Sequence, residues 1–183
     1  MALLLVIFGA LLRIATHFHD SVALFKYLPD IPNFAPIAAI ALFGGTYLSK
    51  KYALIIPAIA MIVADYFIGF YNPFVMISVY GSFIVIGLIG MWLKNHKNIG
   101  NVFGASLLGS SIFFIVTNFA VWLAPQFYYP RTLSGLIDCY ALALPFFRNS
   151  ILGDLTYVII FFGAYELVRL FINQKEKECP KRI

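Results

Sequence analysis

Long apolar runs separated by short polar connections occupy most of this chain of 183 residues. A membrane span needs roughly 20 apolar residues, and several of the runs reach that length. Only 11% of the residues are charged and 62% are hydrophobic, whereas roughly 25% of the residues of a soluble domain are charged. The sequence therefore predicts an all-α membrane protein, with one transmembrane domain over residues 1–172 and a basic tail over residues 173–183.

Six transmembrane helices are predicted, and the charges between them predict their orientation. Their approximate ranges are 2–16, 35–49, 52–71, 74–93, 100–124 and 150–172. With six spans, the basic connections at 50–51 and 94–97 lie on the same side as the basic tail. The positive-inside rule makes that side cytoplasmic. We therefore expect both termini in the cytoplasm and the connections at 17–34, 71–73 and 125–149 outside.

The stretch at residues 128–154 does not fit a simple span. Its apolar run between Arg131 and Arg148 is shorter than the roughly 20 residues that a span needs. The run also contains Asp138 and Pro145, and a proline removes a backbone donor that lipid cannot replace. Such a segment is typical of the membrane interface, or of a loop that enters and leaves on one side.

A seventh span at residues 133–147 would also send the basic tail to the outside. We therefore expect these residues to form an external re-entrant or interfacial segment between the fifth and sixth transmembrane helices. The sixth helix is then expected to begin after Asn149 or Ser150, since either residue is a good N-cap.

Polar residues gather toward the predicted external side of the spans. Charged groups in a membrane are costly, and they usually face a partner or a wet cavity. The candidates to line a substrate-binding pocket are Arg13, Asn33, Asp65, Asn118, Tyr129, Asp138, Cys139, Arg148 and Asp154. The alternative is a set of structural ion pairs, such as Arg13 with Asp65, that tie helix ends together.

Other polar residues have simpler explanations. A carboxylate such as Asp154 is favoured near a helix N-terminus by the helix dipole. Glu166 and Arg169 are three residues apart and predict a local pair on one helix. The sequence His17-Phe18-His19-Asp20 contains metal-ligand residue types, but it is more simply a polar loop, so no metal site is predicted.

Recognisable catalytic motifs do not occur in the sequence. The stretch GASLLGSS at residues 104–111 imitates the glycine spacing of a phosphate-binding loop but lacks the lysine. There is no H-E-x-x-H, G-x-S-x-G or Ser-x-x-Lys motif. The chain is therefore not expected to be an enzyme or to carry a cofactor, and an ATPase that drives transport would have to be another chain. Pairs of small residues four apart, such as Ala41 and Gly45, predict close helix packing.

Three stretches resemble a known group of proteins: NFAPIAAIALFGG at residues 33–45, TNFAVW at residues 117–122, and YPRTLSGLIDCYALALPFFRNSILGDL at residues 129–155. The chain resembles a bacterial family of small integral membrane proteins of unassigned function over about residues 10–170. That family is similar to the substrate-binding S components of energy-coupling-factor vitamin transporters. The resemblance implies six helices in the inner membrane, a pocket closed by the first, third and fifth loops of the chain, which are the three external ones, and a vitamin-like ligand.

The resemblance leaves the partner and the ligand open. S components often carry Ala-x-x-x-Ala on the first helix, where the coupling subunit docks, and this chain lacks that spacing there. The partner is therefore either an energy-coupling membrane subunit with ATPases or none. A corrinoid is one candidate ligand, since its cobalt could accept the thiolate of Cys139. The alternative functions are a structural scaffold protein without a ligand and an intramembrane lipid-modifying enzyme that uses Asp65 and Asp154.

Overall fold

The structure, a computed structural model, describes residues 2–4, 7–8, 11, 37–125 and 129–178. Within these ranges all regular secondary structure is helical and there is no strand. The helices are α2 (Ile37–Tyr47), α3 (Ile55–Ile68), α4 (Pro73–Leu93), α5 (Ile99–Leu123) and α6 (Leu133–Glu178). Residues 2–4, 7–8 and 11 are helical as well. The prediction of an all-α fold is confirmed for the described part of the chain.

Three of these helices are long and apolar enough to cross a membrane: α4, α5 and residues Leu133–Gln174 of α6. The helices α2 and α3 are also apolar but shorter. Large apolar side chains are exposed on the outer surface, for example Ile77, Leu108 and Ile159. Soluble proteins rarely expose contiguous apolar surface on this scale, so the surface is compatible with a lipid environment.

Local signals in the sequence explain where α4 and α5 begin. The side chain of Asn72 accepts hydrogen bonds from the backbone N–H groups of Phe74 and Val75, at 2.8 and 3.2 Å, and Pro73 occupies the first helical position. Proline suits that position because its missing N–H would have no partner there. The side chain of Asn98 caps α5 in the same way, accepting from the N–H of Asn101 at 2.7 Å.

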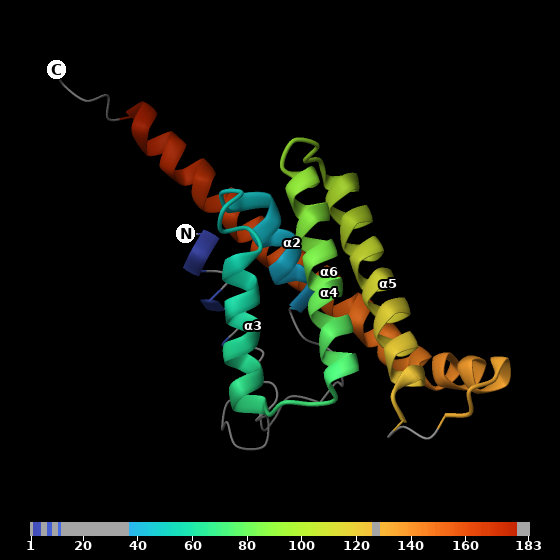
Figure 1. Cartoon of the computed structure of the whole chain (residues 1–183). Helices are drawn as coiled ribbons and strands as arrows, with labels where there is room; N and C mark the ends of the chain where they lie inside the picture. The colour runs from blue at the N-terminus through green and yellow to red at the C-terminus, as the bar shows by residue number, and fades with distance from the viewer. Residues whose placement is uncertain (1, 5–6, 9–10, 12–36, 126–128, 179–183) are drawn as a thin grey trace, which may run out of the picture.

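The short helix α2 lies at the centre of the structure, packed against α4, α6, α5 and α3 (Figure 1). Its residues 38–46 are all buried. The fully buried ring of Phe43 contacts the rings of Phe161, Phe162 and Tyr165 on α6, at centroid distances of 5.4 to 5.9 Å. This aromatic cluster joins α2 to the C-terminal half of α6.

Glycines bring α2 and α4 into direct backbone contact. A Cβ atom added to Gly45 would lie 2.2 Å from the carbonyl oxygen of Gly87, and one added to Gly90 would lie 2.4 Å from the carbonyl oxygen of Leu42. Thr46 adds a polar link, because its hydroxyl lies 2.8 Å from the carbonyl oxygen of Leu42 and 3.1 Å from that of Gly90. The close packing expected from small residues is therefore present at this crossing.

The helix α6 differs from the prediction. The expected helix start after Asn149 or Ser150 is wrong, because α6 runs without interruption from Leu133 to Glu178 and includes Pro145. The hydroxyl of Ser150 donates to the carbonyl oxygen of Phe146 at 3.1 Å. Serine can cap a helix or bond back to the preceding turn, so the capping signal is ambiguous inside a helix.

Figure 1 shows α6 changing direction between its N-terminal part and the remainder. A proline inside a helix removes one hydrogen bond and commonly produces a kink. At about 1.5 Å per residue, a helix of 46 residues is roughly 69 Å long, about twice the thickness of a bilayer core. One part of α6 must therefore lie outside the hydrocarbon core if another part crosses it.

The connections lie at two ends of the structure (Figure 1). The connection between α2 and α3 and the one between α4 and α5 share one end, which carries Lys50, Lys51, Lys94 and Lys97. We call this the basic end, and the C-terminus of α6 extends toward it. The connections between α3 and α4 and between α5 and α6 lie at the opposite end.

Candidate functional site

A buried carboxylate meets the N-terminus of α2. Asp154, on α6, is only 5% exposed and accepts a hydrogen bond from the hydroxyl of Ser110 at 2.7 Å. The backbone N–H groups of Ala38 and Ala39 also donate to it. These two groups lie in the first turn of α2, where N–H groups lack partners within the helix and the dipole favours a negative charge. Asp154 therefore caps α2 from a helix far away in the sequence.

This arrangement lies near the middle of α5, well away from either end of that long helix. Ser110 is close to the centre of Ile99–Leu123. One turn earlier on the same helix, the hydroxyl of Ser106 is buried and has no hydrogen-bond partner among the described residues. We call Asp154, Ser110, Ser106 and the first turn of α2 the α2 N-terminal site. It combines a carboxylate, two hydroxyls and a helix N-terminus in an apolar interior.

Asp65 belongs to a separate polar contact, which joins α3 to α4. It is completely buried, and its carboxylate accepts a hydrogen bond from the hydroxyl of Tyr80 at 2.7 Å. Asp65 is near the C-terminus of α3, which ends at Ile68, so this pair is closer to the opposite end than to the basic end. Asp65 and Asp154 thus have different partners.

A third polar group joins α5 to the N-terminal part of α6. The thiol of Cys139 is 2% exposed and contacts the carbonyl oxygen of Asn118 at 3.5 Å. The hydroxyl of Tyr140 donates to the carbonyl oxygen of Ile115 at 2.6 Å, and its ring packs edge-on against Phe114. Cys139 is therefore part of the packing between α5 and α6, where a buried cysteine behaves as a small apolar side chain.

The remaining predicted site residues are at the surface or outside the described residues. Asp138 and Arg148 are exposed and Tyr129 is partly exposed. Arg13 and Asn33 fall outside the described residues. Of the predicted set, the structure brings Asn118 and Cys139 into direct contact.

Sequence reasoning missed Tyr80, Ser106 and Ser110. The two serines lie in the stretch at residues 104–111, whose glycine spacing resembles that of a phosphate-binding loop. Their spacing of four residues, which puts them on one helix face, was a usable signal. The described residues contain no cluster of three or more histidine, cysteine, aspartate or glutamate side chains that could hold a metal ion.

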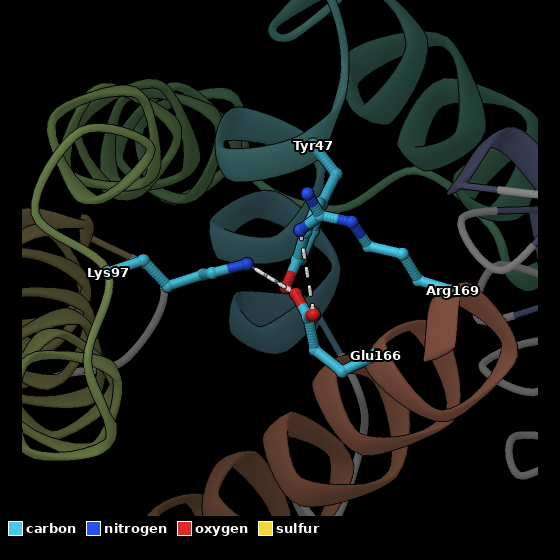
Figure 2. A network of polar contacts seen from close by, with 4 residues as sticks. All are labelled: Tyr47, Lys97, Glu166 and Arg169. Carbon is cyan, nitrogen blue, oxygen red and sulfur yellow. Dashed lines mark hydrogen bonds and ion pairs between the residues drawn. The ribbon is translucent and has the colours of Figure 1, made fainter. Parts of the chain in front are cut away.

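A polar network at the basic end joins elements that are far apart in the sequence. Figure 2 shows Tyr47, Lys97 and Arg169 converging on Glu166. The hydroxyl of Tyr47 donates to Glu166 at 2.7 Å, and Lys97 bonds to the same carboxylate oxygen. The predicted pair of Glu166 and Arg169 is present, with a nitrogen–oxygen distance of 3.7 Å. The network links the end of α2, the connection between α4 and α5, and α6.

The described fold and its buried polar groups define a class: an all-helical protein, with three helices long and apolar enough to cross a membrane and a polar site in the interior. Residues 1–177 match a family of unknown function, DUF6580. Because the match covers nearly the whole chain, the protein belongs to this family. No curated protein matches the chain, and no solved structure matches it.

Proposed function

We propose that the protein is a substrate-binding integral membrane subunit for the uptake of a vitamin or similar small micronutrient. The observation that carries this proposal is the α2 N-terminal site. An eleven-residue helix begins in the interior, beside the buried carboxylate of Asp154. One turn before Ser110 on α5, the buried hydroxyl of Ser106 has no described partner.

The physical chemistry of transporters favours this use of such a site. Many transporters bind substrates near the bilayer midplane, where the N-termini of short helices point at polar groups of the substrate. Ionisable residues inside membrane segments usually line pathways or binding sites, because burying a charge there is costly. The hydroxyl of Ser106 has no described partner, so a ligand can bond to this hydroxyl without breaking a hydrogen bond within the protein.

The proposed topology has six membrane spans, with the basic end in the cytoplasm. The shared position of the two lysine-bearing connections (Figure 1) supports it, since lysines are enriched on the cytoplasmic side. In this arrangement a ligand enters from the opposite end, past Asp65, and Asp138 and Arg148 lie outside. Arg13, Asn33 and Tyr129 complete the proposed entrance. An energy-coupling subunit is the proposed partner if the protein does not act alone.

Ligand binding is tested by thermal unfolding of the purified protein in detergent against a panel of vitamins. A ligand at 100 times its Kd stabilises the folded state by about 2.7 kcal/mol. We expect Ser106→Ala to weaken that shift and to leave the stability of the ligand-free protein nearly unchanged, because the hydroxyl has no described partner to lose. Ser111→Ala is the matched control, because Ser111 already bonds to the carbonyl oxygen of Leu107 at 2.8 Å.

If no compound shifts the unfolding temperature and no small molecule co-purifies, the uptake function is wrong. If a ligand binds but Ser106→Ala and Ser111→Ala behave alike, the protein binds its ligand away from the α2 N-terminal site.

The topology is tested with single cysteines in a chain whose Cys139 and Cys179 have been replaced by alanine. Asn95→Cys places a thiol at the basic end, and Phe70→Cys places one at the opposite end; both native side chains are exposed. A membrane-impermeant thiol reagent should label Phe70→Cys in intact cells and Asn95→Cys only after permeabilisation, because exposed thiols ionise and react readily. The reverse pattern would contradict a cytoplasmic basic end.

A further inference from the structure

Asp154 is a carboxylate in the interior of the helices, and no cation among the described residues lies beside it. Its side chain is 5% exposed. The ion pairs within the described part of the chain are those of Glu166 with Lys97 and with Arg169. An ionised carboxylate without a cation is costly to bury in a membrane protein, and such groups commonly bind a proton instead.

The helices packed around Asp154 supply no charge that could replace this cation. The helices α2, α4 and α5 contain no charged side chain. Their titratable side chains are Tyr47, which bonds at the basic end, and Tyr80, which bonds to Asp65. On α6, Tyr157 lies about one turn from Asp154 and is buried. Tyrosine is neutral in the physiological range, so hydrogen-bond donors and acceptors alone face the carboxylate within the described structure.

The hydroxyl of Ser110 lies between two acceptors but carries only one proton. Its oxygen is 2.7 Å from Oδ2 of Asp154 and 3.1 Å from the carbonyl oxygen of Ser106. When Asp154 is ionised, the hydroxyl can donate to only one of them. When Asp154 is protonated, its O–H donates to Ser110 and Ser110 donates to Ser106, so both contacts are hydrogen bonds. The two arrangements use the same heavy-atom positions.

The start of α2 stabilises the ionised form and disfavours a metal cation. The N–H groups of Ala38 and Ala39 donate to Asp154, and the positive end of the α2 dipole lies beside it. These donors favour a negative charge, whereas the apolar interior disfavours any charge. Both protonation states of the carboxyl group are therefore hydrogen-bonded in the same fold. A metal cation would be repelled by the same N–H groups.

We propose that Asp154 is a proton-binding site, which takes up and releases one proton while the helices keep their arrangement. On protonation, a proton from the solvent binds to Oδ2 of Asp154, and the hydroxyl of Ser110 turns from Asp154 to the carbonyl oxygen of Ser106. The α2 N-terminal site then loses one negative charge. The proton is also the cation to which uptake would be coupled; this last step rests on the proposed function, whereas the proton site does not.

Infrared difference spectroscopy of the full-length protein, in detergent and without ligand, tests the proton site. Spectra are compared between mildly acidic and mildly alkaline buffer, and isotopic labelling of the aspartate carboxyl groups separates the five aspartates from the three glutamates. On acidification the wild type should gain the carbonyl band of a protonated aspartate. Asp154→Asn should lose this band, and it should fold because its amide can accept from α2 and donate to Ser110. Asp138→Asn is the control on the same helix and should keep the band, because Asp138 is exposed.

A second pair of variants tests the hydrogen bond of the bound proton. Ser110→Ala removes its acceptor, so the frequency of the Asp154 band should shift. Ser111→Ala should leave the frequency unchanged, because the hydroxyl of Ser111 bonds to the carbonyl oxygen of Leu107. This pair still decides the question if Asp154→Asn does not fold.

Three results would overturn the proton site: a band that persists in Asp154→Asn, an Asp154 band that does not change with pH, or equal frequencies in Ser110→Ala and Ser111→Ala. A carboxylate band that responds to sodium ions at constant pH would also overturn it, since the site would then bind a metal cation. The spectra are recorded without ligand, so their outcome is independent of whether any vitamin binds.

Discussion

Gly90→Ala is expected to destabilise the protein by about 3 kcal/mol or more, the upper range for overpacking a tight interior. The added Cβ atom would lie 2.4 Å from the carbonyl oxygen of Leu42 and 3.0 Å from the Cα atom of Gly45. Both neighbours are backbone, so no side-chain rotation relieves the overlap. The helices α2 and α4 would have to move apart, which would loosen the packing around Phe43. Reversible unfolding in detergent measures the loss.

Gly81→Ala is the control on the same helix. Its Cβ atom meets nothing within 4 Å, so the substitution should leave stability unchanged or raise it by up to about 1 kcal/mol, because alanine favours helix more than glycine does. Equal stability of the two alanine variants would show that α2 and α4 do not cross as closely as described.

Asp154→Ala is expected to lower the free energy of unfolding by about 2 to 4 kcal/mol. Removing a helix cap costs roughly 1 kcal/mol, and each buried donor left without a partner costs about 1 to 3 kcal/mol. The donors at risk are the hydroxyl of Ser110 and the N–H groups of Ala38 and Ala39. Asp154→Asn should lose less, because its amide oxygen can still accept hydrogen bonds.

Hydrogen–deuterium exchange gives a local readout of the same change. The amides at the start of α2 should exchange faster in Asp154→Ala, whereas those of α4 should change little. Asp138→Ala is the control, since it removes an exposed carboxylate from the same helix and should alter stability by less than about 0.5 kcal/mol. If the two alanine variants are equally stable, Asp154 does not cap α2.

Properties that depend on short stretches of chain were predictable. Hydropathy is a local sum, so the ranges expected for the helices at residues 74–93 and 100–124 differ by one residue at most from the observed ends of α4 and α5. Asn72 and Pro73 mark a helix start because capping involves only the next three residues. The shared end of the two basic connections follows from the even number of helices between them, which are α3 and α4.

Properties that depend on contacts between residues far apart in the chain could not be predicted from short stretches of sequence. Local signals at Pro145 and Ser150 are compatible with both a break and a bent helix, and packing of α6 against α5 and α2 favours continuity. Nothing in the sequence around Asp154 identifies Ala38 and Ala39 as its donors, because the choice of partner depends on how three helices cross. The same holds for Glu166, where Arg169 was predictable at three residues' distance but Tyr47 and Lys97 were not. Hydropathy and capping act over one or two helical turns, whereas the site requires side chains from separate helices to meet in the folded bundle.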